Sequence, residues 1–270
     1  MGGQNGVMAS RKMVFLDVDG TYLAGGVVPP SASDAVRAAR ANGHQVLLCT
    51  GRPLVQIFDE ITEAGFDGVI ASAGGMVTYR GETLHSTAME PDALARAIAW
   101  LDRHGIAYWL ESDTALLGSS GLEDALRGIP PQPYLKVPFT DWDGGPRTDV
   151  RKIVFLGSTL PLAATQEALT GVFDVIGHTI PDLGESMGEI SVAGIHKAAG
   201  IEALIRHAGV DRADTIAFGD GSNDLEMLAY AGVGVAMGDA ADAVKAVADL
   251  VVAPAAEGGI AEGFRRLRLV

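Results

Sequence analysis

The stretch that decides the fold is Met13-Val14-Phe15-Leu16-Asp17-Val18-Asp19-Gly20-Thr21. Its first four residues are apolar, and a short run of this kind is typical of a strand buried in a parallel sheet. The polar residues follow directly, so they lie where the strand ends. In open α/β sheets the ligand site lies beyond the carboxyl ends of the strands. We therefore expect Asp17 and Asp19 to face a binding crevice.

Two other segments repeat this order of an apolar run followed by polar residues. Val46-Leu47-Leu48-Cys49 precedes Thr50-Gly51-Arg52. Ile216-Ala217-Phe218 precedes Gly219-Asp220-Gly221-Ser222-Asn223-Asp224. Because the strand ends of a parallel sheet converge, we expect all three polar segments to meet in one crevice.

Helical patterns separate the apolar runs. Ser31-Ala32-Ser33-Asp34 is an N-cap signal for a helix that ends near Ala41, and Pro53 is suited to the first turn of a helix running to about Glu63. A further helix is expected from Ile195 to about His207. The alternation predicts an α/β fold, a Rossmann-like core of parallel strands with helices on both faces.

The alternation changes between residues 85 and 188. This stretch holds all three tryptophans, a proline- and glycine-rich loop from Gly128 to Arg147, and mixed strand and helix patterns. It predicts an α+β cap domain inserted into the first domain. We expect the core to comprise residues 1–84 and 189–270, and the cap to comprise residues 85–188.

The bulk composition limits the classes of function. A formal net charge of −14 argues against a nucleic-acid or anionic-membrane partner, because no basic run offsets it. The single cysteine, Cys49, excludes an internal disulfide and ends an apolar strand, which indicates packing. Residues 1–12 contain no apolar signal core and are expected to form a frayed leader. We expect a cytoplasmic protein.

The three polar segments together suit a divalent cation and a phosphate group. Asp17 and Asp19 are two apart at a strand end, so one can act as nucleophile and the other as acid and base. Gly20 permits a tight turn, and its backbone amide can face an oxyanion. Asp220 and Asp224 offer hard oxygen ligands of the kind that Mg²⁺ prefers. The plainer alternative for each pair is a turn that caps a strand or a helix.

The remaining candidates are weaker when taken singly. Thr50 and Gly51 can bind phosphate at a helix start, but Thr50 also suits an ordinary N-cap. Arg52 can contact a phosphate or cover the helix end, and both alternatives stay open. Lys197, near the start of its helix, can be an ordinary surface lysine. We do not expect His196 to be catalytic.

In their order along the chain, these segments resemble the haloacid dehalogenase superfamily of phosphotransferases. The large insertion between the second and third motifs resembles the Cof-type sugar-phosphatase branch, as does Val233-Gly234-Val235-Ala236-Met237-Gly238-Asp239-Ala240. The resemblance implies a phosphatase that acts on a small phosphorylated metabolite, such as a sugar phosphate or a cofactor phosphate. Ala73 stands where the branch usually has asparagine. The resemblance therefore implies less about recognition of the leaving group than about the phosphoryl chemistry.

The resemblance also implies a role for each site residue. Asp17 is the expected nucleophile, forming an aspartyl-phosphate, and Asp19 the expected acid and base. Mg²⁺ is expected on Asp17, the backbone carbonyl of Asp19 and Asp220, with Asp224 supporting it. The residues expected to hold the phosphoryl oxygens are Gly20, Thr50, Gly51, Lys197 and Asn223.

Other functions stay open at this point. A phosphomutase on the same scaffold returns the phosphoryl group to the substrate, and a catalytically silent protein only binds phosphate and metal. A dinucleotide-binding oxidoreductase is disfavoured because Met237 replaces the third glycine after Gly232-Val233-Gly234. We expect no nucleic-acid or membrane partner, and a monomer or homodimer.

Overall fold

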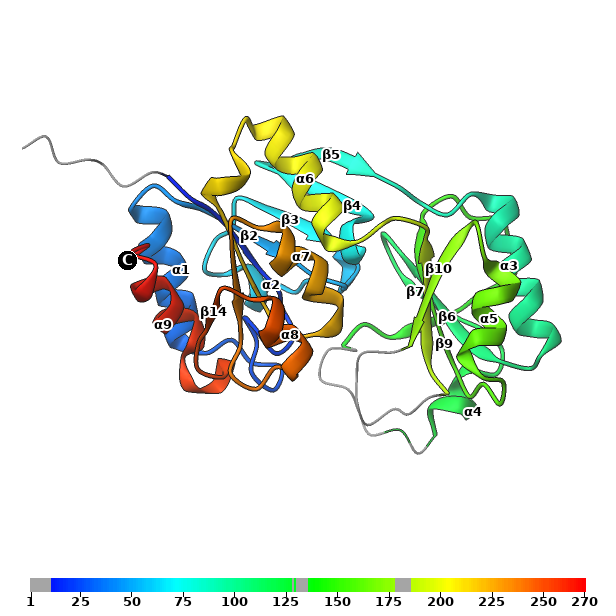
Figure 1. Cartoon of the computed structure of the whole chain (residues 1–270). Helices are drawn as coiled ribbons and strands as arrows, with labels where there is room; N and C mark the ends of the chain where they lie inside the picture. The colour runs from blue at the N-terminus through cyan, green and yellow to red at the C-terminus, as the bar shows by residue number, and fades with distance from the viewer. Residues whose placement is uncertain (1–10, 128, 130–135, 178–185) are drawn as a thin grey trace, which may run out of the picture.

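The computed structural model describes residues 11–127, 129, 136–177 and 186–270. It shows two lobes side by side, joined by the chain before α3 and after β11 (Figure 1). The leader expected at residues 1–12 lies outside the described residues, except for Arg11 and Lys12. Among the helices that are described, none combines the length and the apolar character needed to cross a membrane.

The first lobe is built on an eight-stranded sheet in the order β14-β13-β12-β1-β2-β3-β4-β5. Strands β14 to β3 are parallel, and β4 and β5 continue the sheet as an antiparallel hairpin. The strands are β1 (Met13–Leu16), β2 (Gln45–Cys49), β3 (Gly68–Ala71), β4 (Met76–Tyr79), β5 (Glu82–Ser86), β12 (Thr215–Gly219), β13 (Val233–Ala236) and β14 (Leu250–Val251).

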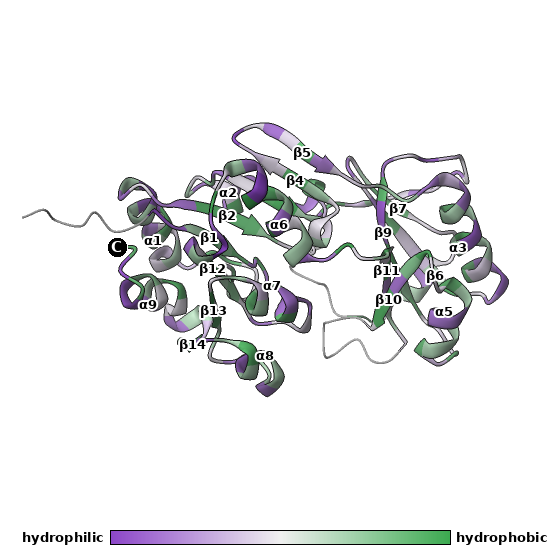
Figure 2. Ribbon diagram, turned by 45° about the horizontal axis from the view of Figure 1, so that its top comes forward, coloured by the Kyte–Doolittle hydropathy of each residue, from purple (hydrophilic) through white to green (hydrophobic). Residues whose placement is uncertain are grey.

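Helices cover both faces of this sheet because successive side chains of a strand point to opposite sides. Val14 and Leu16 of β1 pack in one cluster with α1 (Pro30–Ala41) and α9 (Gly259–Arg266). Met13 and Phe15 pack in the other cluster, which includes α6 (Lys197–Ala208), α7 (Leu225–Tyr230) and α8 (Asp242–Val247). The helices on the outside show both hydrophobic and hydrophilic residues (Figure 2). The expected α/β core is confirmed.

The second lobe contains a six-stranded, mostly antiparallel sheet in the order β10-β11-β9-β6-β7-β8. Its strands are β6 (Ala107–Ser112), β7 (Leu116–Gly118), β8 (Phe139–Asp141), β9 (Val150–Leu156), β10 (Phe173–Gly177) and β11 (Gly188–Val192). Its helices are α3 (Pro91–Arg103), α4 (Leu122–Leu126) and α5 (Leu162–Leu169). The inserted α+β cap is therefore present. Because β11 pairs with β9 and β10, the cap sheet extends to Val192, past the boundary expected at residue 188.

The cap sheet presents one face to its own helices and the other to the core. Ile153 and Phe155 of β9 pack with α3 and α5, whereas Lys152 and Val154 of the same strand line a cavity between the lobes. Arg151 fixes the junction. Its guanidinium forms an ion pair with Asp113 of the cap and donates to the carbonyl oxygen of Gly75 in the core at 3.1 Å.

Two expectations for the core helices are wrong. The helix expected from Pro53 to Glu63 is broken into a 3-10 turn, η1 (Leu54–Gln56), and one turn of helix, α2 (Asp59–Thr62). Arg52 Nη1 donates to the Gln56 carbonyl oxygen at 3.0 Å, which occupies an acceptor that a continuous helix uses internally. Helix α1 begins with Pro30 at its first position, and no side chain caps it.

Candidate active site

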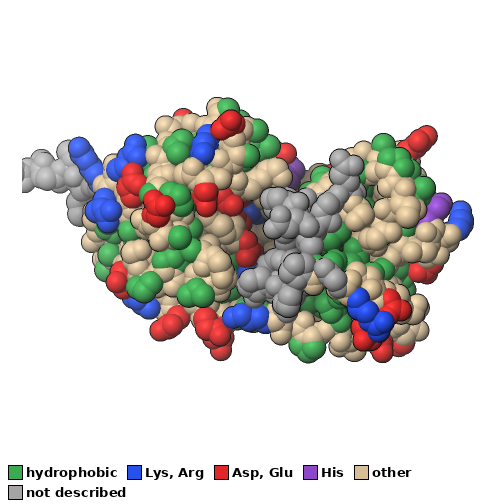
Figure 3. All heavy atoms as spheres, turned by 90° about the horizontal axis from the view of Figure 1, so that it is seen from below, with side chains coloured by type: hydrophobic (Ala, Val, Ile, Leu, Met, Phe, Trp, Pro, Cys, Tyr) green, Lys and Arg blue, Asp and Glu red, His purple; other side chains and the backbone are tan. Residues whose placement is uncertain are grey.

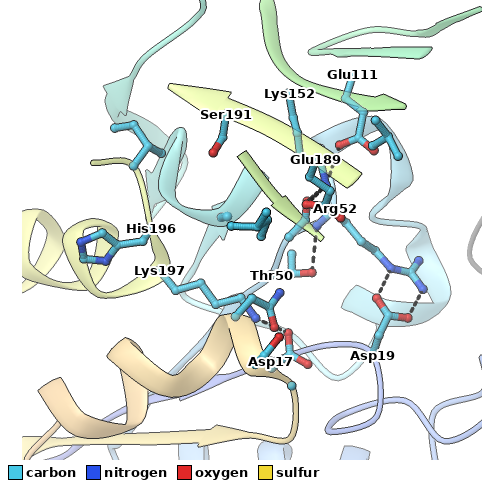
Figure 4. A pocket seen from close by; sticks show the side chains of 18 of the residues that line it. Asp17, Asp19, Thr50, Arg52, Glu111, Lys152, Glu189, Ser191, His196 and Lys197 are labelled. Atoms are coloured by element: carbon cyan, nitrogen blue, oxygen red, sulfur yellow. Dashed lines mark hydrogen bonds and ion pairs between the residues drawn. The ribbon is translucent and has the colours of Figure 1, made fainter. Parts of the chain in front are cut away.

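The ends of β1, β2 and β12 meet at the junction of the two lobes, as the sequence predicts. Asp17 follows β1, Thr50 follows β2, and Asp220 follows β12. All three line one cavity of about 770 Å³, which also reaches the cap sheet (Figure 4). Acidic side chains lie on the core lobe up to this junction, on the face shown in Figure 3.

Lys197 lies at the centre of the site, between two carboxylates. Its Nζ donates to Asp17 Oδ1 and to Asp224 Oδ1, both at 2.6 Å, and its side chain is fully buried. Helix α6 can bring Lys197 this far in because glycines lie where it approaches η2 (Ser72–Gly74). A Cβ on Gly200 would lie 3.2 Å from the Gly74 Cα and 2.7 Å from Ile70. Lys197 is therefore a core residue and not a surface lysine.

The site carries more negative charge than Lys197 neutralises. Burial raises the pKa of Asp17 well above its ordinary value, and Asp224 and Asp220 add to the shift, although Lys197 opposes it. Burial also raises the pKa of Asp220 to about 6. For Lys197, burial lowers the pKa, but the charges of Asp17 and Asp224 raise it by more. A buried cluster of this kind favours a further cation.

Asp224 holds the loop after β12 in place. Its Oδ2 accepts hydrogen bonds from the backbone amides of Asp220 at 3.0 Å and Gly221 at 2.9 Å. With Oδ1 on Lys197, both oxygens of this fully buried carboxylate are engaged. Asp224 thus fixes the backbone of the loop that carries Asp220.

Asp220 is positioned by the turn that follows β1. Thr21 Oγ1 donates to Asp220 Oδ1 at 2.7 Å. Gly20 has a φ of +81°, and a Cβ there would lie only 2.2 Å from Asp220 Oδ2. A glycine is therefore required at this position, both for the backbone conformation and for the close approach of the carboxylate.

The predicted phosphate-binding residues also line the cavity. Thr50 is buried, and its Oγ1 accepts a hydrogen bond from the Arg52 amide at 3.1 Å, which leaves the hydroxyl proton to donate elsewhere. A Cβ on Gly51 would lie 3.6 Å from Asn223 Nδ2, so these two residues are neighbours across the site. Gly20, Lys197 and the pair Gly51 and Asn223 complete the wall. The ring of His196 instead caps its own helix, with Nδ1 accepting from the Ala199 amide.

Arg52 has a role that the sequence left open. Its guanidinium binds the Asp19 carboxylate through two bonds, Nε to Oδ2 at 2.8 Å and Nη2 to Oδ1 at 2.6 Å. Arg52 is buried, whereas the Asp19 side chain is 48% exposed. Neither of the two interpretations of Arg52, a phosphate contact or a helix cover, foresaw this pair. The two residues are far apart in sequence, so no local pattern signals it.

The residues present fit a divalent cation. Ligand atoms of Asp17, Asp220 and Asp224 all lie within 4.8 Å of one another. The bonds to Lys197 and Thr21 use one oxygen each of Asp17 and Asp220, so the second oxygen of each carboxylate is a suitable ligand. Few protein carboxylates and several waters are typical of Mg²⁺.

The cap supplies wall residues that the sequence could not identify. Trp109, Glu111, Lys152 and Glu189 project from three neighbouring strands of the cap sheet into the cavity. Lys152 Nζ also donates to the Gly51 carbonyl oxygen at 3.2 Å, which links the cap to the loop after β2. The alternation of side chains along these strands indicated that one face of the cap sheet lines the cavity, but nothing in the sequence identified that face.

Comparison with known proteins agrees with this architecture. Residues 14–264 match the family model of the haloacid dehalogenase-like hydrolases. A protein of Bacillus subtilis called "Putative phosphatase YkrA" is 30% identical over 265 residues, which is 96% of this chain and 98% of that protein. The pyridoxal phosphate phosphatase YbhA of Escherichia coli is 27% identical, over 90% of this chain and 93% of that protein.

The solved structures show the same fold. The sugar phosphatase BT4131, of subclass IIB of the superfamily, superposes with a TM-score of 0.80 at 24% identity, covering 96% of this chain and 100% of that chain. The likeness extends through both lobes and therefore includes the cap. The chain belongs to the haloacid dehalogenase-like hydrolases, in the Cof-type branch with a large inserted cap.

Proposed function

We propose that this protein is a Mg²⁺-dependent phosphatase that hydrolyses the phosphate monoester of a small metabolite, a sugar phosphate or a cofactor phosphate. The observation that carries the proposal is the buried contact of Lys197 with Asp17 and Asp224, 2.6 Å each, beside Asp220. Such a site holds a nucleophile, a fixed positive charge and cation ligands around one point. The names of the two phosphatase relatives agree with this reaction.

In the first step, an oxygen of Asp17 attacks the phosphorus atom and forms an aspartyl-phosphate. The bond between phosphorus and the leaving oxygen breaks, and Asp19 gives its proton to that oxygen. Lys197, the Thr50 hydroxyl and Asn223 bind the phosphoryl oxygens as their charge rearranges. A bound Mg²⁺, held by Asp17, the Asp19 carbonyl and Asp220, supplies electrostatic stabilisation of that charge.

In the second step, Asp19 takes a proton from a water molecule that attacks the aspartyl-phosphate. The bond from phosphorus to Asp17 breaks, inorganic phosphate leaves, and both carboxylates return to their starting state. Arg52 controls the position of Asp19 through its two hydrogen bonds. Because Asp19 is half-exposed, it can turn toward the reacting oxygen without leaving the cavity.

The test is phosphate release from a panel of phosphorylated metabolites, with Mg²⁺ and with chelator, by the wild type and Asp17→Asn. We expect release that requires Mg²⁺ and that Asp17→Asn abolishes, because an amide is a poor nucleophile. Unchanged activity in that variant would refute the assigned nucleophile.

The same assay separates the other two candidates. An isomeric phosphate ester formed without inorganic phosphate identifies a phosphomutase. Binding of phosphate and Mg²⁺ without turnover of any ester identifies a silent binding protein.

A further inference from the structure

The core segment from Gly51 to Phe58 contacts both the cap and Asp19, and we call it the bridging segment. Its first residue is bonded to the cap, because Lys152 Nζ donates to the Gly51 carbonyl oxygen at 3.2 Å. The guanidinium of its second residue, Arg52, binds both oxygens of the Asp19 carboxylate (Figure 4). One short segment therefore connects the cap with the acid and base of the proposed reaction.

Val55, in the middle of the bridging segment, packs into the cap. It lies against an apolar cluster whose buried members all belong to the cap: Trp109, Leu116, Leu122, Val154, Leu156 and Met187. Among the described residues of this cluster, Val55 alone comes from the core. Because removal of apolar surface from water is favourable, the docked cap stabilises this position of the bridging segment.

A third contact joins the last residue of the bridging segment to the cap. The ammonium group of Lys136 lies 5.1 Å from the centroid of the Phe58 ring, and Arg52 Cζ lies 6.0 Å from the same centroid. Cations at such distances from the face of an aromatic ring are attracted to it. Phe58 thus interacts with a cation of the cap and with the guanidinium that binds Asp19.

The turn that carries Val55 also orients Arg52. Arg52 Nη1 donates to the carbonyl oxygen of Gln56, the residue after Val55, at 3.0 Å. The turn itself, η1, has only three residues and no side-chain cap. A helical turn this short depends on tertiary packing for its stability. A shift of Val55 therefore displaces the acceptor that holds the Arg52 guanidinium.

Arg52 is the fixed partner of its pair with Asp19. The Arg52 side chain is buried, whereas the Asp19 side chain is half-exposed. The two hydrogen bonds from Arg52 therefore determine where the Asp19 oxygens lie. A general acid has to be within hydrogen-bond reach of the oxygen that it protonates. The position of the acid thus depends on Arg52, and the position of Arg52 depends on the bridging segment.

We propose that Val55 is a positioning residue for proton transfer. Packed into the cap, it holds the η1 turn in place, and through Arg52 it keeps Asp19 where this residue protonates the leaving oxygen. The acid is then in position when the cap covers the core. This proposal rests on the phosphatase function proposed above, and it concerns the proton transfer and not the recognition of any group of the substrate.

The test compares two esters of similar shape that differ in their need for a proton. p-Nitrophenyl phosphate releases a stable phenolate without protonation, whereas phenyl phosphate releases a much more basic one. We expect Asp19→Asn to lower kcat/KM for phenyl phosphate by about 100-fold or more, and Val55→Ala to lower it by roughly tenfold, because the acid is then present but misplaced. For p-nitrophenyl phosphate, Val55→Ala should lower kcat/KM by less than about threefold.

Three further variants test whether the effect is specific. Val55→Ile keeps the apolar contact with the cap and should keep the wild-type ratio of the two esters. Val233→Ala on β13 makes the same change at a half-buried valine of the other lobe face and should also keep that ratio. Val55→Ala combined with Asp19→Asn should lower phenyl phosphate turnover no further than Asp19→Asn alone, because residues that act as a unit are not additive.

The outcomes separate this proposal from the function on which it depends. If Val55→Ala lowers both esters by the same factor, or if its loss multiplies with that of Asp19→Asn, the positioning role is wrong and the phosphatase function stands. If the wild type hydrolyses neither ester, or if Asp19→Asn affects both equally, the proposed function or its acid fails, and the positioning role fails with it.

A second variant keeps the test decisive if thermal unfolding shows that Val55→Ala does not fold. Phe58→Leu removes the ring near Lys136 and Arg52 but keeps an apolar side chain. It should also lower kcat/KM for phenyl phosphate more than for p-nitrophenyl phosphate. An equal loss for the two esters would overturn the proposal.

Discussion

Replacement of Lys197 by methionine tests the electrostatic centre of the site. The variant removes the ammonium group from between Asp17 and Asp224, 2.6 Å from an oxygen of each, and leaves both carboxylates buried. Breaking a buried ion pair by removing one partner costs about 3–5 kcal/mol. At about 2–4 °C per kcal/mol for a chain of this size, the melting temperature in chelator should fall by about 6–20 °C.

Two controls make this prediction specific. Lys245→Met on α8 removes a lysine outside the site and should change stability by no more than about 0.5 kcal/mol. Lys197→Met combined with Asp224→Asn should lose less stability than the sum of the single variants, because the two side chains interact directly.

Thermal unfolding followed by circular dichroism, with chelator and with Mg²⁺, provides the measurement. Mg²⁺ should recover part of the stability lost in Lys197→Met, since it supplies positive charge to the same carboxylates. Phosphate release should be lost in either case. A variant that melts with the wild type in chelator would refute the account of a buried, charge-balancing lysine.

The remaining predictions concern the cation, the turn after β1 and Ala73. Because burial raises the pKa of Asp220 from 3.8 to about 6, the metal-free protein keeps that group's stabilising contribution below about pH 4 and loses it as the pH rises through 6. The rise in melting temperature caused by Mg²⁺ should therefore grow between pH 5 and 7; an equal rise at pH 5 and 7.5 would contradict the assignment. Gly20→Ala should lower the free energy of unfolding by about 1–2 kcal/mol, because alanine is strained in the left-handed backbone at this position. The added methyl group should also displace Asp220 and so weaken Mg²⁺ binding, measured by titration calorimetry. A variant that binds Mg²⁺ with wild-type affinity would exclude the close contact between Gly20 and Asp220. Ala73 also has a left-handed backbone, with a φ of 54°, a conformation that asparagine adopts more readily than alanine. Ala73→Asn should therefore raise the free energy of unfolding by about 0.5–1 kcal/mol, measured by denaturant unfolding. A lower free energy of unfolding would show that the cavity wall cannot accept the amide.

Much of the core could be predicted because it follows from local rules. Four-residue apolar runs such as Met13–Leu16 are buried strands, and the polar residues after them converge because the strands are parallel. The structure brings Asp17, Thr50 and Asp220 to one cavity for this reason, whereas Lys197 reaches the same cavity from the start of α6. The resemblance to a known family supplied the order of the motifs.

What could not be predicted depends on contacts between distant residues. The helix expected from Pro53 breaks because Arg52 turns to bind Asp19 and the Gln56 carbonyl oxygen. The ion pairs of Lys152 with Glu111 and Glu189 join strands β6, β9 and β11, whose pairing is not encoded in any local pattern. Strand β8 (Phe139–Asp141) lies in the stretch that was expected to be a loop. It could not be predicted because it is short and pairs only with β7 at the edge of the sheet.

The most direct test of the central claim is the mass of the Asp19→Asn variant mixed with p-nitrophenyl phosphate and Mg²⁺ and quenched in acid. The leaving group of this ester needs no proton, so Asp17 can still attack, but the loss of the general base slows release of the phosphoryl group. We predict an intact mass increased by one phosphoryl group, located on the peptide that contains Asp17 and absent when Asp17→Asn is added. Nitrophenol release with no phosphorylated protein, or with the group on another residue, would contradict the account.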